Sequence, residues 1–367
     1  MPNPWTLLLT VGGGDPMRPV GGVPLVRRLV LEAQRTFAET FVVCGSSPEM
    51  DRVLDDPRIT LKRLPDVPTH GVTLELPAHC LVHRQTFLAL QQLQPSPGAL
   101  PERLTLDALP PPSDTPYWFA PIAVVDANAA KQAERALFRS LRKREDGWTA
   151  RWLNRYISLA ISRYLARTRL HPNQLSFAIL LVGLFGAYLA SLGTYATMAL
   201  GALLFQLQSI LDGCDGELSR VTFRGSYLGE WLDTIGDDIT NYSFFVGAAI
   251  GLYRNTGSTL YLVAGAVTLC SGLLASGLEY RYLLSIHSGD LLKYPLSQAT
   301  TSQSGRFGSI APLFKRDTFV FLTLIAALFD VLGAALVAFS VGALGVLASV
   351  LSTEMRLARE RKASRTT

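Results

Sequence analysis

Apolar residues are unevenly distributed along this chain. Short apolar stretches alternate with polar turns before about residue 175, and long apolar runs follow. Each long run is close to the roughly 20 residues that a helix needs to cross the hydrocarbon core of a bilayer. The pattern therefore predicts an α-helical integral membrane domain with six transmembrane helices. The expected spans are residues 175–194, 197–218, 229–252, 258–280, 317–333 and 336–354.

The first part of the chain has the pattern of a small α/β domain. Residues 5–11 form an apolar run that ends in three glycines, a helical pattern follows over residues 24–39, and residues 40–43 are apolar again. Strand, Gly-rich loop, helix and strand are typical of Rossmann-like domains, whose loop N–H groups bind phosphate. A tight turn without a ligand is the alternative. Further along, we expect a loop over residues 90–116, a last strand over 117–125 and a helix over 127–143.

An amphipathic helix is expected between these two parts. Its aromatic face and its basic face are Trp148, Trp152, Tyr156 and Leu159, and Arg151, Arg155, Arg163 and Arg167. Such a helix lies in the membrane interface with its basic side toward the headgroups; a solvated helix packed on the α/β domain is the alternative. The chain then divides into a cytoplasmic α/β domain (1–140), a juxtamembrane helix and linker (141–171), a six-span domain (172–356) and a basic cytoplasmic tail (357–367).

Lysines and arginines gather in the connections after the second, fourth and sixth spans, whereas the other connections together hold one arginine. By the positive-inside rule, these basic connections and both termini face the cytoplasm of an inner-membrane protein. The net charge of +5 therefore indicates membrane lipids and substrate phosphates as partners rather than nucleic acid. Four cysteines without metal spacing indicate free thiols in a reducing setting. The first residues lack the basic start of a signal peptide.

Carboxylates stand at the cytoplasmic ends of the second and third spans, where charge is costly and usually functional. Asp212 and Asp215 share one helix face, and Asp233 and Asp237 share another. Four converging carboxylates repel each other unless cations neutralise them. All-oxygen ligation suits two Mg²⁺ or Mn²⁺ ions, which could bridge a pyrophosphate. Interhelical hydrogen bonds and membrane-edge charges are the alternative, but they explain only one or two of the four residues.

Other polar positions suggest where substrates bind. Gly216 and Gly229 leave room for a close approach to the backbone, and Arg220 suits bidentate contact with phosphate. A basic cluster after the fourth span either holds a phosphate on an acceptor or reflects membrane topology alone. Its members are Arg281, Lys293, Arg306, Lys315 and Arg316, with Glu279 as a further polar lining residue.

The acidic stretch resembles the motif of the CDP-alcohol phosphotransferase family, D-x2-D-G-x2-A-R-x8-G-x3-D-x3-D. The residues at these spacings are Asp212, Asp215, Gly216, Arg220, Gly229, Asp233 and Asp237, and Ser219 replaces the alanine. Asn173 and Ser176 match the family's entry to the first span. The resemblance covers about residues 140–356.

The resemblance implies an enzyme that transfers a phosphoalcohol group from a CDP-alcohol to an acceptor hydroxyl and releases CMP. It implies that Asp212, Asp215 and Asp233 bind two metal ions, and that Asp237 completes the site and acts as the general base. By the same resemblance, Gly216, Arg220, Gly229, Asn173 and Ser176 line the donor. Asp238 lies outside the motif and is expected to be a bystander. Family members are often homodimers.

The start of the chain resembles sugar-nucleotidyltransferase domains, with Gly22–Leu25 matching their G-x-P-L turn. The loop is shortened, Arg18-Pro19 stands where a Pro-Lys pair is expected, and no acidic metal ligand is apparent, so we expect a degenerate cytidylyltransferase-like domain. The favoured hypothesis is that CDP-diacylglycerol is the donor and that the product is a lipid. CDP-inositol with inositol phosphate is the alternative, because similar domains are fused to enzymes that use them.

Two other classes of protein make different predictions from the enzyme. A cation-coupled transporter would carry acidic residues near the midplane of several spans, whereas here they gather at one end. An inactive membrane scaffold would have lost carboxylates of the motif, and none is lost.

Overall fold

The computed structural model of the protein describes residues 5–68, 71–92, 103–105, 117–142, 146–297 and 315–363. The chain divides into two compact units. The α/β unit comprises residues 1–144, 163–168 and 221–223, and the helical unit comprises residues 145–162, 169–220 and 224–367.

The α/β unit is built on a parallel sheet with the strand order β5-β4-β1-β6-β8. The chain runs outward from β1 on one side and then returns to β6 on the other, so the order reverses between β1 and β6, as in doubly wound folds. The strands are β1 (Trp5–Thr10), β2 (Pro19–Val20), β3 (Val23–Pro24), β4 (Thr40–Cys44), β5 (Lys62–Arg63), β6 (Val72–Pro77), β7 (Cys80–Leu81), β8 (Arg103–Leu104) and β9 (Ile122–Ala123). The helices are α1 (Leu25–Thr36), α2 (Pro48–Leu54), α3 (Arg84–Gln92) and α4 (Ala127–Arg139).

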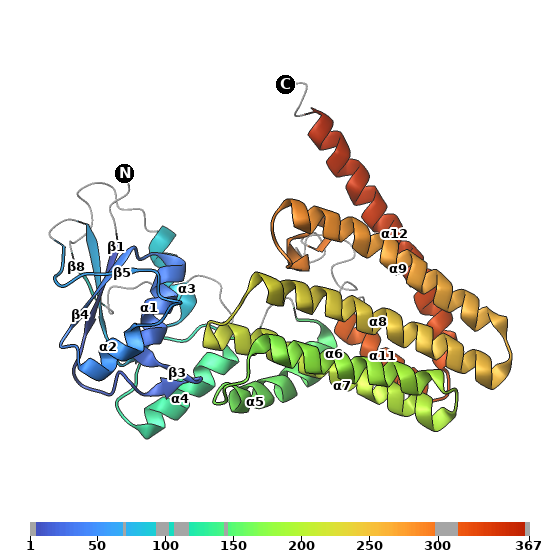
Figure 1. Ribbon diagram of the computed structural model, residues 1–367, viewed down its shortest axis with the longest axis horizontal. Coiled ribbons are helices and arrows are strands. Elements are labelled where there is room, and N and C mark those ends of the chain that lie inside the picture. The colour runs from blue at the N-terminus through green and yellow to red at the C-terminus, as the bar shows by residue number, and fades with distance from the viewer. Residues whose placement is uncertain are drawn as a thin grey trace. The chain divides into compact units, whose positions relative to one another are not determined.

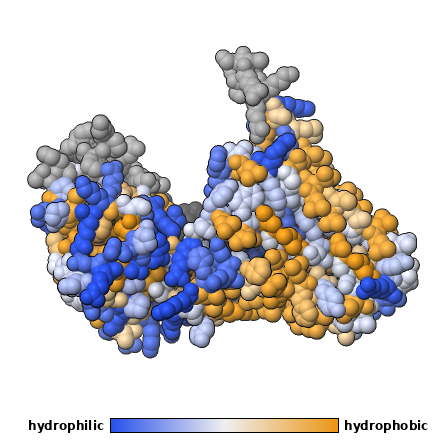
Figure 2. Space-filling model, in the orientation of Figure 1, coloured by the Kyte–Doolittle hydropathy of each residue, from blue (hydrophilic) through white to orange (hydrophobic). Residues whose placement is uncertain are grey.

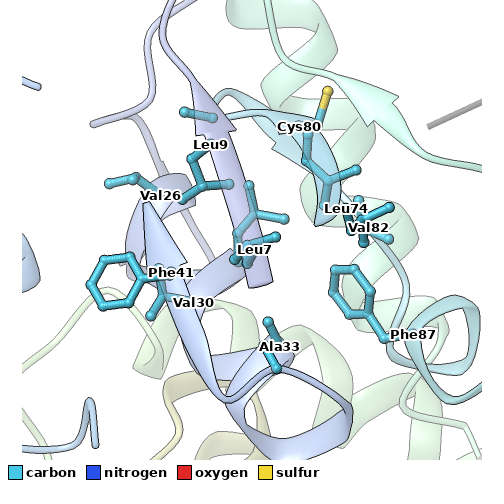
Figure 3. Close-up of a cluster of buried hydrophobic side chains, with 14 of the residues drawn as sticks. Leu7, Leu9, Val26, Val30, Ala33, Phe41, Leu74, Cys80, Val82 and Phe87 are labelled. Atoms are coloured by element: carbon cyan, nitrogen blue, oxygen red, sulfur yellow. The ribbon is translucent and has the colours of Figure 1, made fainter. Parts of the chain in front are cut away.

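The core of this unit follows from the apolar run of β1, whose leucines are buried on both faces of the sheet. Leu7 and Leu9 pack in one cluster with Val30 of α1 and Phe87 of α3 (Figure 3). The predicted order of strand, Gly-rich loop, helix and strand is confirmed by β1, α1 and β4.

The last strand predicted over residues 117–125 is present but much shorter, because β9 covers only Ile122–Ala123. The strand β9 has two residues and pairs antiparallel with β7, outside the main sheet. The expected loop over residues 90–116 contains β8, which pairs parallel with β6. Most of that loop lies outside the described residues. Isolated two-residue pairings have no period in the sequence, so the pattern predicts neither the strand β8 nor the bounds of β9.

The helical unit consists of long helices that pack side by side (Figure 1). They are α5 (Arg155–Leu165), α6 (Pro172–Ser191), α7 (Tyr195–Thr222), α8 (Tyr227–Thr256), α9 (Thr259–Ser285), α11 (Arg316–Leu328) and α12 (Leu332–Ala363), with a π-helical turn η2 (Ala150–Asn154) and a 3₁₀ turn η3 (Leu291–Lys293). The helix α8 packs on α6 and α9, and α9 also packs on α12. The apolar runs therefore form helices as predicted, although α11 ends at Leu328 rather than at residue 333.

Small residues let α6 and α8 approach closely, as is common where membrane helices pack. A Cβ atom at Gly251 of α8 would lie 2.0 Å from the carbonyl oxygen of Ala190 in α6, and one at Gly247 would lie 2.3 Å from that of Ala187. Neither contact leaves space for a methyl group. The separation of these two helices is thus set by backbone contact.

Three helices of the described chain are long and apolar enough to cross a membrane, judged by length and composition. They are Pro172–Ser191, Thr259–Ser285 and Leu332–Glu360. On α6, the exposed side chains include Phe177, Leu181 and Phe185, which recur every four residues and form an apolar stripe. Hydrophobic residues cover much of the visible surface of these helices (Figure 2). The helical unit therefore has the surface of a membrane protein.

The segment before α6 forms a helix with an exposed aromatic face. Trp148 is 58% exposed, Trp152 is 64% exposed and Tyr156 is 55% exposed. The opposite face differs from the prediction, because Arg155 does not point outward. Its guanidinium forms ion pairs with Asp146 and with a carboxylate of α7.

Candidate functional site

Two helices bring the four aspartates of the acidic stretch to one pocket. Asp212 and Asp215 lie on α7, and Asp233 and Asp237 lie on α8. All four line the pocket, because residues three or four apart share a helix face. The remaining lining residues come from α6, α7 and α8: Ser176, Ile179, Leu180, Gln208, Leu232 and Gly236.

The start of α8 and the start of α6 meet at this site. Ser226 caps α8 by accepting a hydrogen bond from the N–H of Gly229 at 3.0 Å. A Cβ at Gly229 would lie 3.0 Å from Oδ1 of Asn173, which is in the first turn of α6. One turn along, Ser176 donates a hydrogen bond to Oδ2 of Asp215. Of these expected donor contacts, Ser176 lines the pocket and touches an aspartate, whereas Asn173 and Gly229 lie together one turn before Ser176 and Asp233.

Gly216 and Arg220 are neighbours on α7. The N–H of Gly216 donates to Oδ1 of Asp215 at 2.6 Å, and a Cβ at Gly216 would lie 3.5 Å from the guanidinium of Arg220. Arg220 also interacts electrostatically with Asp233. The guanidinium therefore lies within the electrostatic reach of the acidic cluster.

The first residue of α11, Arg316, places its guanidinium among the carboxylates. Its Nη1 lies 2.8 Å from Oδ1 of Asp237 and 3.2 Å from Oδ2 of Asp212. Its Nη2 donates to Oε1 of Gln208 at 2.7 Å, and its Nε donates to Oδ1 of Asn241 at 3.3 Å. In this arrangement Arg316 supplies the counter-charge for one carboxylate from each motif helix.

The donor atoms of this pocket suit a hard divalent cation. The contact between Arg316 and Oδ1 of Asp237 is an ion pair with unsuitable geometry for a hydrogen bond, so this buried oxygen accepts no hydrogen bond from the described residues. Within the described ranges, no three His, Cys, Asp or Glu side chains converge as a preformed metal site. Cation binding by all four aspartates would therefore require the guanidinium of Arg316 to move.

Two other residues of the predicted acceptor cluster have partners elsewhere. Arg281 of α9 forms an ion pair with Glu354 of α12 at 2.7 Å. Lys293 of η3 donates to Oγ of Ser288 at 2.9 Å. Of this cluster, Arg316 is in direct contact with the aspartates.

The rest of that cluster is divided between the pocket and the undescribed part of the chain. Lys315 immediately precedes α11 and is thus adjacent to Arg316. Arg306 lies outside the described residues.

Asp238, which follows the last motif aspartate, does not line the pocket. Its Oδ2 accepts hydrogen bonds from Ser276 at 2.5 Å and from Tyr280 at 2.6 Å, both on α9. Glu279 precedes Tyr280 and is half-buried. Asp238 thus joins α8 to α9 rather than contributing to the acidic pocket.

The Gly-rich loop of the α/β unit packs against a histidine of its own chain. A Cβ at Gly14 would lie 2.7 Å from the imidazole of His79, and one at Gly13 would lie 3.3 Å from it. His79 is 7% exposed and follows β6. The space beside these two glycines is thus filled by this imidazole.

Three polar residues of the two motif helices were not singled out from the sequence. Gln208 precedes Asp212 by one helical turn, and this spacing is a signal that was available. Asn241 is likewise one turn after Asp237. Glu217 is a charged residue buried in α7, and its partners lie on another helix. Only the folded chain shows those partners.

The apolar helices and the acidic pocket define a helical membrane protein with a charged site between its helices. The family model described as CDP-alcohol phosphatidyltransferase matches residues 169–353, about half of the chain. The chain belongs to this family of transferases.

Curated relatives carry the name "Bifunctional IPC transferase and DIPP synthase". The one from Aquifex aeolicus is 40% identical over 107 residues, which is 29% of this chain and 24% of the relative. The one from Thermococcus kodakarensis is 31% identical over 202 residues, which is 55% of this chain and 42% of the relative. These matches thus span less than half the length of either relative.

A solved structure of phosphatidylinositol phosphate synthase from Mycobacterium tuberculosis, with CDP-DAG bound, is also similar. It is 19% identical, with a TM-score of 0.42, and the match covers 54% of this chain and 93% of that one.

Proposed function

We propose that this protein transfers a phosphoalcohol group from a CDP-alcohol to an acceptor hydroxyl and releases CMP, as a step in phospholipid synthesis. The observation that carries the proposal is the pocket lined by Asp212, Asp215, Asp233 and Asp237, in a chain that belongs to the CDP-alcohol phosphatidyltransferase family. The favoured donor is CDP-diacylglycerol, so that the transferred group is phosphatidyl.

The four aspartates hold two divalent cations, Mg²⁺ or Mn²⁺, in this proposal. When bound, such ions neutralise the pyrophosphate and stabilise the charge on the leaving CMP. Their binding fits a pocket in which carboxylates need a counter-charge and Asp237 keeps an oxygen without a hydrogen bond. Asn173, Ser176, Gly216, Arg220 and Gly229 line the donor, since they lie close to the aspartates.

Asp237 acts as the general base. Its carboxylate takes the proton of the acceptor hydroxyl, the hydroxyl oxygen forms a bond to the β-phosphorus, and the bond from that phosphorus to the oxygen of CMP breaks. Arg316 lies 2.8 Å from this carboxylate. Among the described basic residues proposed to bind a phosphate on the acceptor, Arg316 therefore lies at the carboxylates, with Lys315 next to it in sequence.

A second candidate donor is CDP-inositol, with inositol phosphate as the acceptor. The name of the curated relatives is compatible with this alternative. The α/β unit has the doubly wound strand order of nucleotide-binding folds, but His79 fills the space beside its Gly-rich loop. We therefore propose that residues 1–140, the main part of this unit, form a degenerate cytidylyltransferase-like domain.

The proposed membrane arrangement has six spans, both termini and the acidic pocket on the cytoplasmic side of the inner membrane, and a homodimer as the working unit. The juxtamembrane segment is residues 141–171, the six-span domain is residues 172–356 and the basic tail is residues 357–367. Six helices at the expected positions and a family match over residues 169–353 support this division. The placement of the basic connections supports the orientation.

The proposal is tested by assaying the purified full chain, in lipid vesicles with Mg²⁺ or Mn²⁺, against a panel of donors and acceptors. We expect CMP release from a CDP-alcohol only when the matching acceptor is present, and loss of release in EDTA. Release with CDP-diacylglycerol supports the favoured reading, and release only with CDP-inositol selects the second candidate. A chain that releases no CMP from any pair, yet binds the cation, contradicts the enzymatic proposal.

A further inference from the structure

Glu217 is a fully buried carboxylate next to the aspartate motif, and the proposed reaction does not use it. It lies two residues after Asp215 on α7 and points away from the pocket, because a helix turns by roughly 100° per residue. A charge buried at such a position is costly unless it is well paired. Its partners therefore show what this position does.

Within the described residues, the side chains that hydrogen-bond to Glu217 come from the juxtamembrane helix α5. Its Oε1 accepts hydrogen bonds from Nη1 of Arg155 at 2.7 Å and from Oγ of Ser158 at 2.8 Å. Its Oε2 accepts a hydrogen bond from Oγ of Ser162 at 2.7 Å. The three donors are spaced so that they occupy one face of α5. Both carboxylate oxygens are thus held by one rigid element.

The packing around this carboxylate is close. A Cβ at Gly213, one turn before Glu217, would lie 3.3 Å from Oγ of Ser158 and 3.4 Å from Nη1 of Arg155. The guanidinium of Arg155 also binds Asp146 through two hydrogen bonds, at 2.8 Å and 3.0 Å. The helix α7 can therefore rotate or slide against α5 only if buried ionic hydrogen bonds break.

The turn η2, which directly precedes α5, is hydrogen-bonded to the start of α11. Oδ2 of Asp317 accepts a hydrogen bond from the N–H of Ala150, at the beginning of η2, at 2.6 Å. The residue before it, Arg316, contacts the aspartates. The segment formed by η2 and α5 thus contacts both α7 and the start of α11.

We infer that Glu217 is a positioning residue for the acidic pocket. Together with Arg155, Ser158 and Ser162, it fixes the rotation of α7 about its axis and hence the direction in which Asp212 and Asp215 face the pocket. The juxtamembrane helix is then part of the support of the cation site, in addition to lying along the membrane. This inference rests on the proposed function, because it concerns cation binding by the same aspartates.

The test compares Glu217→Gln with the parent chain in lipid vesicles. This substitution leaves Arg155 paired with Asp146, so no buried charge loses its only partner. We measure Mn²⁺ affinity by electron paramagnetic resonance, CMP release and the thermal unfolding midpoint. Loss of a residue that orients ligands typically weakens metal binding by 10- to 100-fold. We therefore expect Mn²⁺ affinity and kcat to fall by about 10-fold or more, with a smaller change in the KM of the donor.

A matched control comes from the same interface, three turns earlier on α7. There, Nε2 of Gln206 donates to Oδ1 of Asn154 at 3.1 Å, and both side chains are buried. Gln206→Met removes this link and should lower the unfolding midpoint while leaving Mn²⁺ affinity within about twofold of the parent, since the lost bond lies away from the aspartates. Ser162→Ala, which removes one hydrogen bond and no charge, should give an intermediate loss of affinity.

Equal Mn²⁺ affinity in Glu217→Gln and the parent would overturn the inference, and so would an equal loss in Glu217→Gln and Gln206→Met. If Glu217→Gln does not fold, Ser162→Ala decides between the two outcomes. Failure of the proposed function has a different signature. In that case the parent chain either binds no Mn²⁺ or binds it equally well after Asp212→Asn. The inference about Glu217 then fails together with the proposed function.

Discussion

At the scale of single residues, the site consists of carboxylates whose negative charge is partly neutralised by one arginine. Two carboxylates from different helices share one guanidinium, that of Arg316, and a third carboxylate, Asp215, accepts a hydrogen bond from Ser176. The same carboxylates are the proposed cation ligands. Arg316 and a divalent cation therefore compete for the same oxygens, which makes the arginine a sensitive probe of the pocket.

Asp237→Asn should abolish most of the CMP release. The amide cannot take a proton from the acceptor hydroxyl, and loss of a general base typically slows a reaction by about 10² to 10⁴-fold. The adjacent Asp238→Asn is the matched control, since Asp238 faces Ser276 and Tyr280 rather than the pocket. We expect its rate of CMP release to stay within roughly threefold of the parent. Equal rates for Asp237→Asn and the parent would refute the assignment of the base.

Arg316→Gln should lower the thermal stability of the chain in EDTA and make that stability more responsive to Mg²⁺. Without the guanidinium, Asp212 and Asp237 repel each other, and a bound cation relieves the repulsion by mass action. Thermal unfolding with and without Mg²⁺ measures both effects. Arg281→Gln is the control. It breaks an ion pair whose arginine is 67% exposed, and such exposed pairs contribute about 0–1 kcal/mol to the free energy of unfolding. If both variants respond alike to Mg²⁺, Arg316 is not the counter-charge of the cation site.

At the scale of elements, backbone contact between α6 and α8 sets the geometry of the pocket. α6 carries Ser176, α8 carries Asp233 and Asp237, and the two helices touch at the end remote from these residues. The small residues at that contact act as a spacer. Any side chain added there must push the helices apart.

Gly251→Ala should therefore destabilise the helical unit, by about 1–3 kcal/mol, as is typical of overpacking. The added Cβ would lie 2.0 Å from the carbonyl oxygen of Ala190, so the backbone must move. Gly345→Ala in α12 is the control, because no atom lies within 4 Å of a Cβ at that position, and alanine is a better helix former than glycine. Urea or thermal unfolding in lipid vesicles measures both. Similar stability of the two variants would show that the helices are not held in backbone contact.

At the scale of the whole molecule, the chain has two units with separate cores. One core lies between a parallel sheet and its helices. The other lies between packed helices, where the rings of Phe205 and Phe244 stack with their centroids 4.3 Å apart. Conditions that weaken one core need not weaken the other. Acid is such a condition, since the α/β unit contains a buried histidine.

Burial lowers the pKa of His83 from 6.5 to about 4, and its Nδ1 accepts a hydrogen bond from the N–H of Gln85 at 3.1 Å. The unfolded chain therefore binds the proton first as the pH falls. The stability contribution is complete above about pH 6.5 and is lost between that pH and about 4. It amounts to at most roughly 3 kcal/mol.

We expect the α/β unit, and not the helical unit, to become less stable between pH 7 and pH 5. Pulse proteolysis in urea, with the cut sites located by mass spectrometry, scores the two units separately. In His83→Gln the pH dependence of the α/β unit should be smaller than in the parent. An unchanged slope in this variant would mean that other groups cause the effect.

The class of each part and the positions of the aspartates follow from local patterns in the sequence. Periodicity is enough for this, because burial of apolar residues in a helix or strand leaves a local signal of fixed period. The spacing of Asp212 to Asp237 is local in the same sense, and it carried the family resemblance. The short strand β8 had no such signal and was not predicted, and β9 is much shorter than the strand predicted there.

The residues that surround the aspartates, by contrast, depend on how the helices pack. Arg316 lies 104 positions after Asp212, and Arg155 lies 62 positions before Glu217, yet each pair is in contact. No periodic pattern relates residues that are so far apart in sequence. Their contacts depend on which helix faces pack together, and this is settled by close packing such as that at Gly251. Local spacing thus located the acidic pocket, whereas helix packing determines that Arg316 contacts it and that α5 supports it.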